Sequence, residues 1–289
     1  MRIVLVCQDN AEGVVLGAVV SRFFREDELV PEVIVTDSVL NFEIAEGTPC
    51  EVCFLGFSLV DFSADDLLEG STVRLQALID QGYRLTAFCS YLDAEEIETL
   101  DQISVQRGPR PFVERFSHSL LASPRNWYYR KAVEVLSENL GRPLGSWIAW
   151  IRDSLAEVFG KRRTERAAYL ITLLQSSQSP DETVQRWLDE RQQRIDAGIA
   201  LVQEKAVRYG TSVYVVDAAL VHHHVPLIAE ALGAKVLLHF ENRRSAYSFY
   251  STDPRLFRRL PPEIRRDQPF RMIRREHLEA AIKEVLKLV

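Results

Sequence analysis

In the first 108 residues, short apolar runs alternate with stretches of helical period, and this alternation restricts the fold more than any other feature of the sequence. Such alternation is typical of βα units, in which helices connect neighbouring strands of a parallel sheet. Four of the runs predict strands, at Arg2–Cys7, Glu32–Thr36, Cys50–Phe57 and Arg84–Phe88. The pattern therefore predicts an α/β fold with a mostly parallel N-terminal sheet.

Two helices are predicted between these strands, at Gly13–Phe24 and Ser71–Gln81. Open α/β sheets bind ligands at the edge where the carboxyl ends of the strands meet. We therefore expect the functional residues of this sheet near Cys7–Gly13, Gly56–Ser58 and Cys89–Tyr91.

Residues 124–209 have helical period throughout, and a second α/β section follows them. The predicted helices are Asn126–Asn139, Leu144–Phe159, Thr164–Gln175 and Pro180–Tyr209. In the last section we predict strands at Thr211–Val216, Ala234–Glu241 and Ala246–Ser251, and helices at Pro226–Leu232 and Arg275–Leu288. This organisation predicts an α/β domain with a helical section over residues 1–190 and a smaller C-terminal α/β domain over residues 191–289, with the helix that ends at Tyr209 as a connector.

The composition places the chain among globular proteins of a reducing compartment. Its apolar fraction of 47% is large enough for a core and excludes global disorder. No stretch approaches the roughly 18 apolar residues of a membrane span. Its four cysteines, at positions 7, 50, 53 and 89, do not make a disulfide framework. We therefore expect a cytoplasmic protein without a membrane partner.

Charge is divided unevenly along the chain. Residues 1–108 contain 6 Lys and Arg against 20 Asp and Glu, whereas residues 243–275 contain 10 Arg against 3 acidic residues. Guanidinium groups bind phosphates in bidentate geometry, so the arginine-rich segment predicts phosphate binding. The candidate residues are Arg243, Arg244, Arg258, Arg259, Arg265 and Arg266. The alternative is that these arginines neutralise the acidic N-terminal half.

Three predicted strand ends contain the letters VCQDNAEG, FLGFS and TAFCSY. Together with the order of sheet, helical section, connector and small α/β lobe, they resemble the motifs of the DHH phosphoesterase superfamily. That superfamily includes RecJ-like single-strand exonucleases, oligoribonucleases and exopolyphosphatase-like enzymes. The resemblance covers most of the chain and implies a two-metal site at the ends of the N-terminal strands.

Seven positions of this sequence match the metal ligands of that superfamily: Gln8, Asn10, Glu12, Gly56, Cys89, Ser90 and Tyr91. The superfamily has His-x-Asp-x-Asp-Gly around the first three, a bridging aspartate at the fourth and the triplet Asp-His-His at the last three. Among these seven residues only Glu12 is a carboxylate, whereas manganese and magnesium are held by anionic oxygen and imidazole ligands. We therefore expect no metal at these positions and no cofactor.

In the C-terminal lobe, the stretch HFENRRSAYSFYS resembles the paired strands of the superfamily's smaller domain. The superfamily has a Ser-x-Arg-Ser-like stretch there, and later a Gly-Gly-Gly-His loop that grips substrate phosphate. In this chain Tyr250 stands in place of the arginine, and residues 255–275 contain no glycine. What remains is the density of arginine, which is compatible with a sequence-independent basic groove.

Two functions stay open. The leading hypothesis is a catalytically degenerate relative of the DHH superfamily that binds single-stranded nucleic acid, a nucleotide or a protein partner in the cleft between its lobes. A homodimer is compatible with the same hypothesis. The alternative is an active metal-dependent phosphodiesterase or exonuclease, with Mn²⁺ or Mg²⁺ at an altered site formed by Asp9, Glu12 and Asp93.

Two further patterns favour structural roles. The run His222–His224 stands just before a predicted helix start, and consecutive side chains point in different directions, which favours a surface turn or an interface over a shared ion. Cys50 and Cys53 form one CxxC pair, and the sequence has no second pair that would complete a tetrahedral zinc site.

Overall fold

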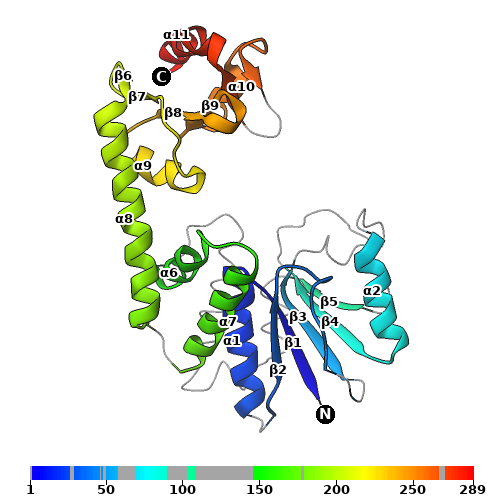
Figure 1. The fold of residues 1–289 in the computed structure, drawn as a ribbon. Helices are drawn as coiled ribbons and strands as arrows, with labels where there is room; N and C mark the ends of the chain where they lie inside the picture. Colours follow the sequence, from blue (N-terminus) through cyan, green and yellow to red (C-terminus); the bar gives the residue numbers. More distant parts are fainter. Residues whose placement is uncertain are drawn as a thin grey trace. The chain divides into compact units, whose positions relative to one another are not determined.

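The computed structural model describes residues 2–26, 29–45, 47, 50–57, 69–89, 103–107, 146–176, 179–266 and 271–289. The chain divides into two compact units, Met1–Gln185 and Arg186–Val289, which are called unit 1 and unit 2 below. Each unit is built around a sheet of its own (Figure 1). Among the described helices, none has the length and apolarity needed to cross a membrane.

Unit 1 contains a five-stranded parallel sheet, which confirms the predicted α/β class. Its strands are β1 (Ile3–Gln8), β2 (Glu32–Thr36), β3 (Glu51–Phe57), β4 (Arg84–Cys89) and β5 (Ile103–Arg107). Their spatial order is β2-β1-β3-β4-β5. The predictions do not include β5, because its five residues ISVQR mix polar and apolar letters and form no apolar run.

Two helices lie side by side on one face of this sheet (Figure 1). They are α1 (Ala11–Glu26), which contacts β1 and β3, and α7 (Lys161–Ser176). The fit is close at Gly17, where a Cβ atom would come within 2.7 Å of Cys7 Sγ and 3.0 Å of the Ile171 side chain. A glycine at this position therefore lets α1 lie directly on β1 and against α7.

The opposite face of the sheet packs against α2 (Glu69–Asp80). Val6 of β1, Phe54 of β3 and Leu75 of α2 are fully buried in this core. Burial of an apolar side chain of this size stabilises a fold by about 1.5–3 kcal/mol. One more described helix of unit 1, α6 (Ser146–Leu155), contacts α1 and α7.

Unit 2 contains most of the long helix α8 (Glu182–Lys205) and a six-stranded mixed sheet. The strands are β6 (Val207–Tyr209), β7 (Val213–Val216), β8 (Val236–Glu241), β9 (Ala246–Ser251), β10 (Arg265–Arg266) and β11 (Met272–Arg274), in the spatial order β10-β11-β9-β8-β7-β6. β7 and β8 pair in parallel, and the other neighbours pair antiparallel. The shorter helices are η2 (His222–His224), α9 (Val225–Ala231), η3 (Asn242–Arg244), α10 (Leu256–Arg259), η4 (Arg275–His277) and α11 (Leu278–Leu288).

The alternation of β8 divides its residues between two cores. Leu238 belongs to the core formed with α10 and α11, whereas Leu237 belongs to the core formed with α8 and α9. His239 and Glu241 follow Leu237 by two and four residues, so they lie on the α9 side of the sheet. One buried face of unit 2 therefore ends in polar residues.

Some predictions for unit 2 are wrong at the ends of elements. The helix predicted to reach Tyr209 ends at Lys205, because residues 207–209 pair with β7 as strand β6. The closing helix begins at Leu278, after the short turn η4. The short elements α10, β10 and β11 are not among the predictions, and the predicted helix Asn126–Asn139 lies outside the described residues.

Candidate functional site

The carboxyl ends of β1 and β3 meet the start of α1 in a turn that is closed by side-chain amides. Gln8 is the last residue of β1, and Asn10 lies in the turn before α1. The Asn10 amide nitrogen donates to Gln8 Oε1 at 2.5 Å and to the Gly56 carbonyl oxygen at 3.0 Å. The Gly13 N–H donates in turn to Asn10 Oδ1 at 2.7 Å. One amide therefore joins both strands to the helix, and both of its polar ends have protein partners.

Gly13 and Gly56 pack backbone against backbone at this turn. Gly56 has a φ of 80°, in the left-handed region that residues with a Cβ atom rarely adopt. A Cβ atom on Gly56 would lie 2.5 Å from the nitrogen and 2.6 Å from the Cα atom of Gly13. The pairing of β3 with β4 shifts register at the same place, between Leu55 and Phe57. Position 56 therefore has no room for a side chain unless the backbone moves.

Asp9, beside the turn, is paired with Arg163 of α7. Arg163 Nε lies 3.4 Å from Asp9 Oδ1 and donates to the Asp9 carbonyl oxygen at 2.8 Å. Burial raises the pKa of Asp9 above its ordinary value of 3.8, although Arg163 acts in the opposite direction. Glu12, in the first turn of α1, is also buried. The carboxylate of Asp9 thus faces a cation that the protein itself provides.

Of the six arginines predicted to bind phosphate, the two in η3 and the two in α10 are exposed: Arg243, Arg244, Arg258 and Arg259. Arg265, in β10, is half-buried, and the side chain of Arg266 lies outside the described residues. Within the part of the chain that the structure describes, the guanidinium groups of Arg243, Arg258 and Arg259 form no ion pair.

Two cavities of unit 2 share His222 and Ser248. The larger has a volume of about 340 Å³ and is also lined by Tyr250 and Arg271. The smaller has a volume of about 240 Å³ and is also lined by Arg244. Guanidinium, hydroxyl and aromatic groups are those with which proteins contact the phosphates, sugars and bases of single strands. The larger volume lies within the range of about 300–1,000 Å³ that is usual for ligand pockets.

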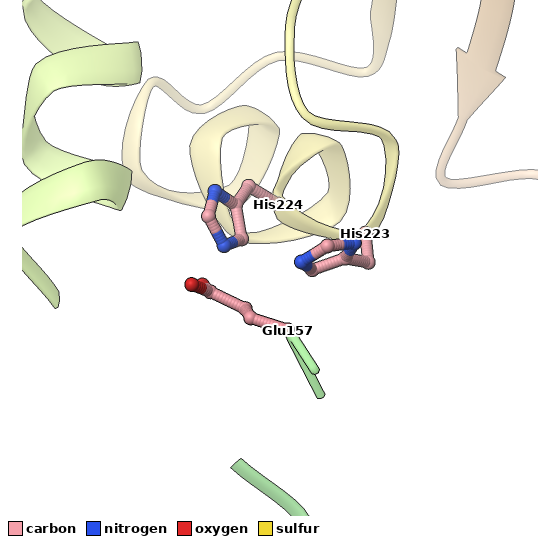
Figure 2. A group of neighbouring side chains, drawn as sticks. All are labelled: Glu157, His223 and His224. Carbon is pink, nitrogen blue, oxygen red and sulfur yellow. The ribbon is translucent and has the colours of Figure 1, made fainter. Parts of the chain in front are cut away.

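The three consecutive histidines form η2, at the start of α9. The rings of His223 and His224 meet edge to face, with their centroids 4.6 Å apart (Figure 2). Glu157, which the figure also labels, is a residue of unit 1. His222 lines both cavities of unit 2.

The fold has counterparts among solved structures, while no family model and no curated protein matches the sequence. RecJ of Thermus thermophilus in complex with Mn²⁺ is matched over 99% of this chain and 52% of its own, at 12% identity and a TM-score of 0.52. The chain has a RecJ-like fold. Below a TM-score of 0.5 come PggH, a pGpG-specific phosphodiesterase of Vibrio cholerae (99% of both chains, 10% identity, TM-score 0.49), and CDC45 of Entamoeba histolytica (99% of this chain and 95% of that one, 8% identity, TM-score 0.41). This chain spans about half the length of the Thermus RecJ.

In this RecJ-like fold, three of the positions matched to metal ligands come together: Gln8, Asn10 and Gly56. Cys89 is the last residue of β4, and its side chain lies outside the described residues, as do Ser90, Tyr91 and Asp93. Of the CxxC pair, Cys53 lies in β3 and Cys50 directly precedes that strand; Cys50 belongs to the core that packs against α2, and Cys53 does not.

Sequence reasoning missed several residues of unit 2 that line the cavities or face them. The sequence pattern places Ser248 only within the paired strands and Arg271 only within the basic segment. A signal did exist for His239 and Glu241, because two polar letters at a spacing of two on an apolar strand indicate a polar patch on one face. For His222 the signal is the histidine run itself, which the sequence assigns to a surface turn or an interface, because its approach to His239 depends on the loop after β7.

Proposed function

We propose that the chain is a RecJ-like protein that binds single-stranded nucleic acid through unit 2 and does not hydrolyse it. The observation that carries the proposal is the amide network of Asn10. Its two polar ends bond to Gln8, Gly13 and Gly56 at the strand ends where the DHH superfamily would place metal ligands. An amide whose two polar ends are both engaged by the protein has little to offer a cation.

The described residues of this turn do not fit a pair of manganese or magnesium ions. Such ions are held by carboxylate and imidazole groups, whose charge offsets the loss of water from the ions. Positions 8 and 10 carry neutral amides bonded to each other, position 56 has no room for a side chain, and Asp9 is paired with Arg163. We therefore derive no hydrolytic step from this turn.

Unit 2 has the charge and the surface for binding a single strand. Residues 186–289 contain 18 Lys and Arg against 13 Asp and Glu, although the whole chain has a net charge of −6. Arg271 and Tyr250 line the larger cavity and Arg244 the smaller one, so cations and a ring stand close to the shared Ser248. A phosphate would contact the guanidinium groups and a base would stack on the tyrosine.

Fluorescence anisotropy with a labelled single-stranded oligonucleotide tests this function, at about 50 mM salt and without divalent ions. Arg271→Ala should weaken binding by roughly ten- to a hundredfold, because a hydrogen bond to a charged group contributes about 1.5–3 kcal/mol. The matched control is Arg186→Ala, an exposed arginine of α8 that lines neither cavity, and it should bind as the parent does.

Two results would contradict the proposal. If the parent does not bind at low salt, the arginines have another role, and a protein partner becomes the better hypothesis. If the parent cleaves the oligonucleotide after Mn²⁺ is added, the altered-site phosphodiesterase is correct.

A further inference from the structure

Three potential metal ligands of unit 2 come together on the α9 side of its sheet. His239 and Glu241 lie two residues apart on β8, and His222 comes from η2, which follows the parallel neighbour β7. One ligand atom from each of the three side chains lies within 4.8 Å of the other two. His239 is fully buried, Glu241 is half-buried and His222 is exposed.

The hydrogen bonds of His239 are poor for a ring without exposed surface. Its Nδ1 accepts a long hydrogen bond from the Leu220 N–H at 3.4 Å and lies 4.0 Å from Glu241 Oε1. Its Nε2 has no hydrogen-bond partner among the described residues. Buried polar atoms of structural residues are nearly always paired, so this ring is not explained as a satisfied core histidine.

We propose that His222, His239 and Glu241 form a binding site for one zinc-type divalent cation in unit 2. Two imidazoles and one carboxylate are a donor set that suits zinc, whereas magnesium and calcium prefer oxygen ligands. The site goes beyond the proposed binding of nucleic acid and does not depend on it. It is also unrelated to the turn between β1 and β3, which belongs to unit 1.

Closure of the site around an ion requires only small movements. Zinc binds imidazole and carboxylate ligands at about 2.0–2.2 Å in tetrahedral geometry, which places ligand atoms roughly 3.4 Å apart. The ligand atoms, now up to 4.8 Å apart, must therefore move closer to one another by about 1 Å. Rotation of the exposed His222 and of the half-buried Glu241 supplies this movement, while His239 stays fixed in the core.

A fourth ligand position would face the smaller cavity, of about 240 Å³, because His222 and Glu241 both line it. Three protein ligands and an accessible fourth position are typical of sites that keep a bound water or accept an anionic oxygen. Ser248 and Arg244 line the same cavity, so an incoming anion would also meet a hydroxyl and a guanidinium group.

Calorimetric titration of the metal-free full chain with Zn²⁺ tests the site, in the absence of nucleic acid. Absorption spectra with Co²⁺ give a second readout, because nitrogen ligands in tetrahedral geometry produce visible bands. We expect one ion per chain at this site. His222→Ala and Glu241→Gln should each weaken binding by at least about tenfold, because loss of even an outer-shell partner costs 10–100-fold. They should also remove the visible bands of cobalt.

The controls are the neighbouring His223→Ala and the distant His277→Ala, both of which should bind as the parent does. His222 is exposed, and far-UV circular dichroism checks that each variant is folded. Binding that is unchanged in both His222→Ala and Glu241→Gln would overturn the proposal. So would an equal loss in His223→Ala, which would place the ion on the histidine run. Since no nucleic acid is present, failure of the proposed function leaves these outcomes unaffected.

Discussion

Replacement of Gly56 by alanine should destabilise unit 1 by about 2–5 kcal/mol. The residue has a φ of 80°, and the left-handed conformation costs a residue with a Cβ atom roughly 1–2 kcal/mol. The new atom would also lie 2.5 Å from the Gly13 nitrogen, and relief of such overpacking costs about 1–3 kcal/mol. Domains are stable by about 5–15 kcal/mol, so unit 1 would stay folded with a much smaller margin.

Gly160 provides a matched control in the same unit. It has a φ of 54°, and a Cβ atom there would meet nothing within 4 Å, so Gly160→Ala costs the conformational part alone. In urea denaturation followed by circular dichroism, small proteins have slopes of about 1–3 kcal/mol per molar. The two variants should therefore differ in midpoint by on the order of 1 M. Equal midpoints would refute the view that the end of β3 lies against the start of α1.

Three more changes have definite expected outcomes. Replacing Arg258 and Arg259 together by alanine should reduce the slope of log affinity against log salt concentration by about 1.4, because each lost phosphate contact removes roughly 0.7. An unchanged slope in anisotropy titrations would show that the phosphate contacts lie elsewhere. Burial raises the pKa of Asp9 above 3.8, so protonation of Asp9 stabilises the folded state below pH 3.8, and this stabilisation is lost as the pH rises through the pKa of the folded protein. Thermal melts across this pH range should show the loss in the parent and not in Asp9→Asn. Burial lowers the pKa of His239 from 6.5 to about 4, so the free energy of unfolding of unit 2 should decrease by up to about 3 kcal/mol as the pH falls from 6.5 to 4. Urea titrations at pH 7 and about pH 5 should show this decrease in the parent and not in His239→Asn.

The sequence was most informative where a segment forms a buried strand. Val4, Val52 and their neighbours form apolar runs that predict β1 to β4 to within two residues at each end, because strands buried on both faces leave little room for polar letters. β5 and β6 have no such run. A three-residue strand such as β6 is defined by its pairing with β7, and pairing is not encoded in the local pattern.

The sequence predicts where in the fold the candidate site lies, but it does not predict how the side chains and backbone of the site are oriented. Gln8, Asn10 and Gly56 meet at the strand ends as the parallel order implies. The direction of the Asn10 amide and the φ of Gly56 depend on how α1 leaves β1, which the letters do not specify. Likewise, alternation places His239 and Glu241 on one face, whereas the approach of His222 depends on the path of residues 217–221.

Because α1 packs closely on β1, the reactivity of the Cys7 thiol reports on the unfolding of unit 1. Its thiol has no exposed surface, and burial raises its pKa, so the reactive thiolate is nearly absent while unit 1 is folded. An alkylating reagent reaches this sulfur only after the helix has left the strand. Its rate of modification therefore measures how often unit 1 opens. By the same reasoning, oxidants should not react with the Cys7 thiol for as long as α1 remains packed on β1.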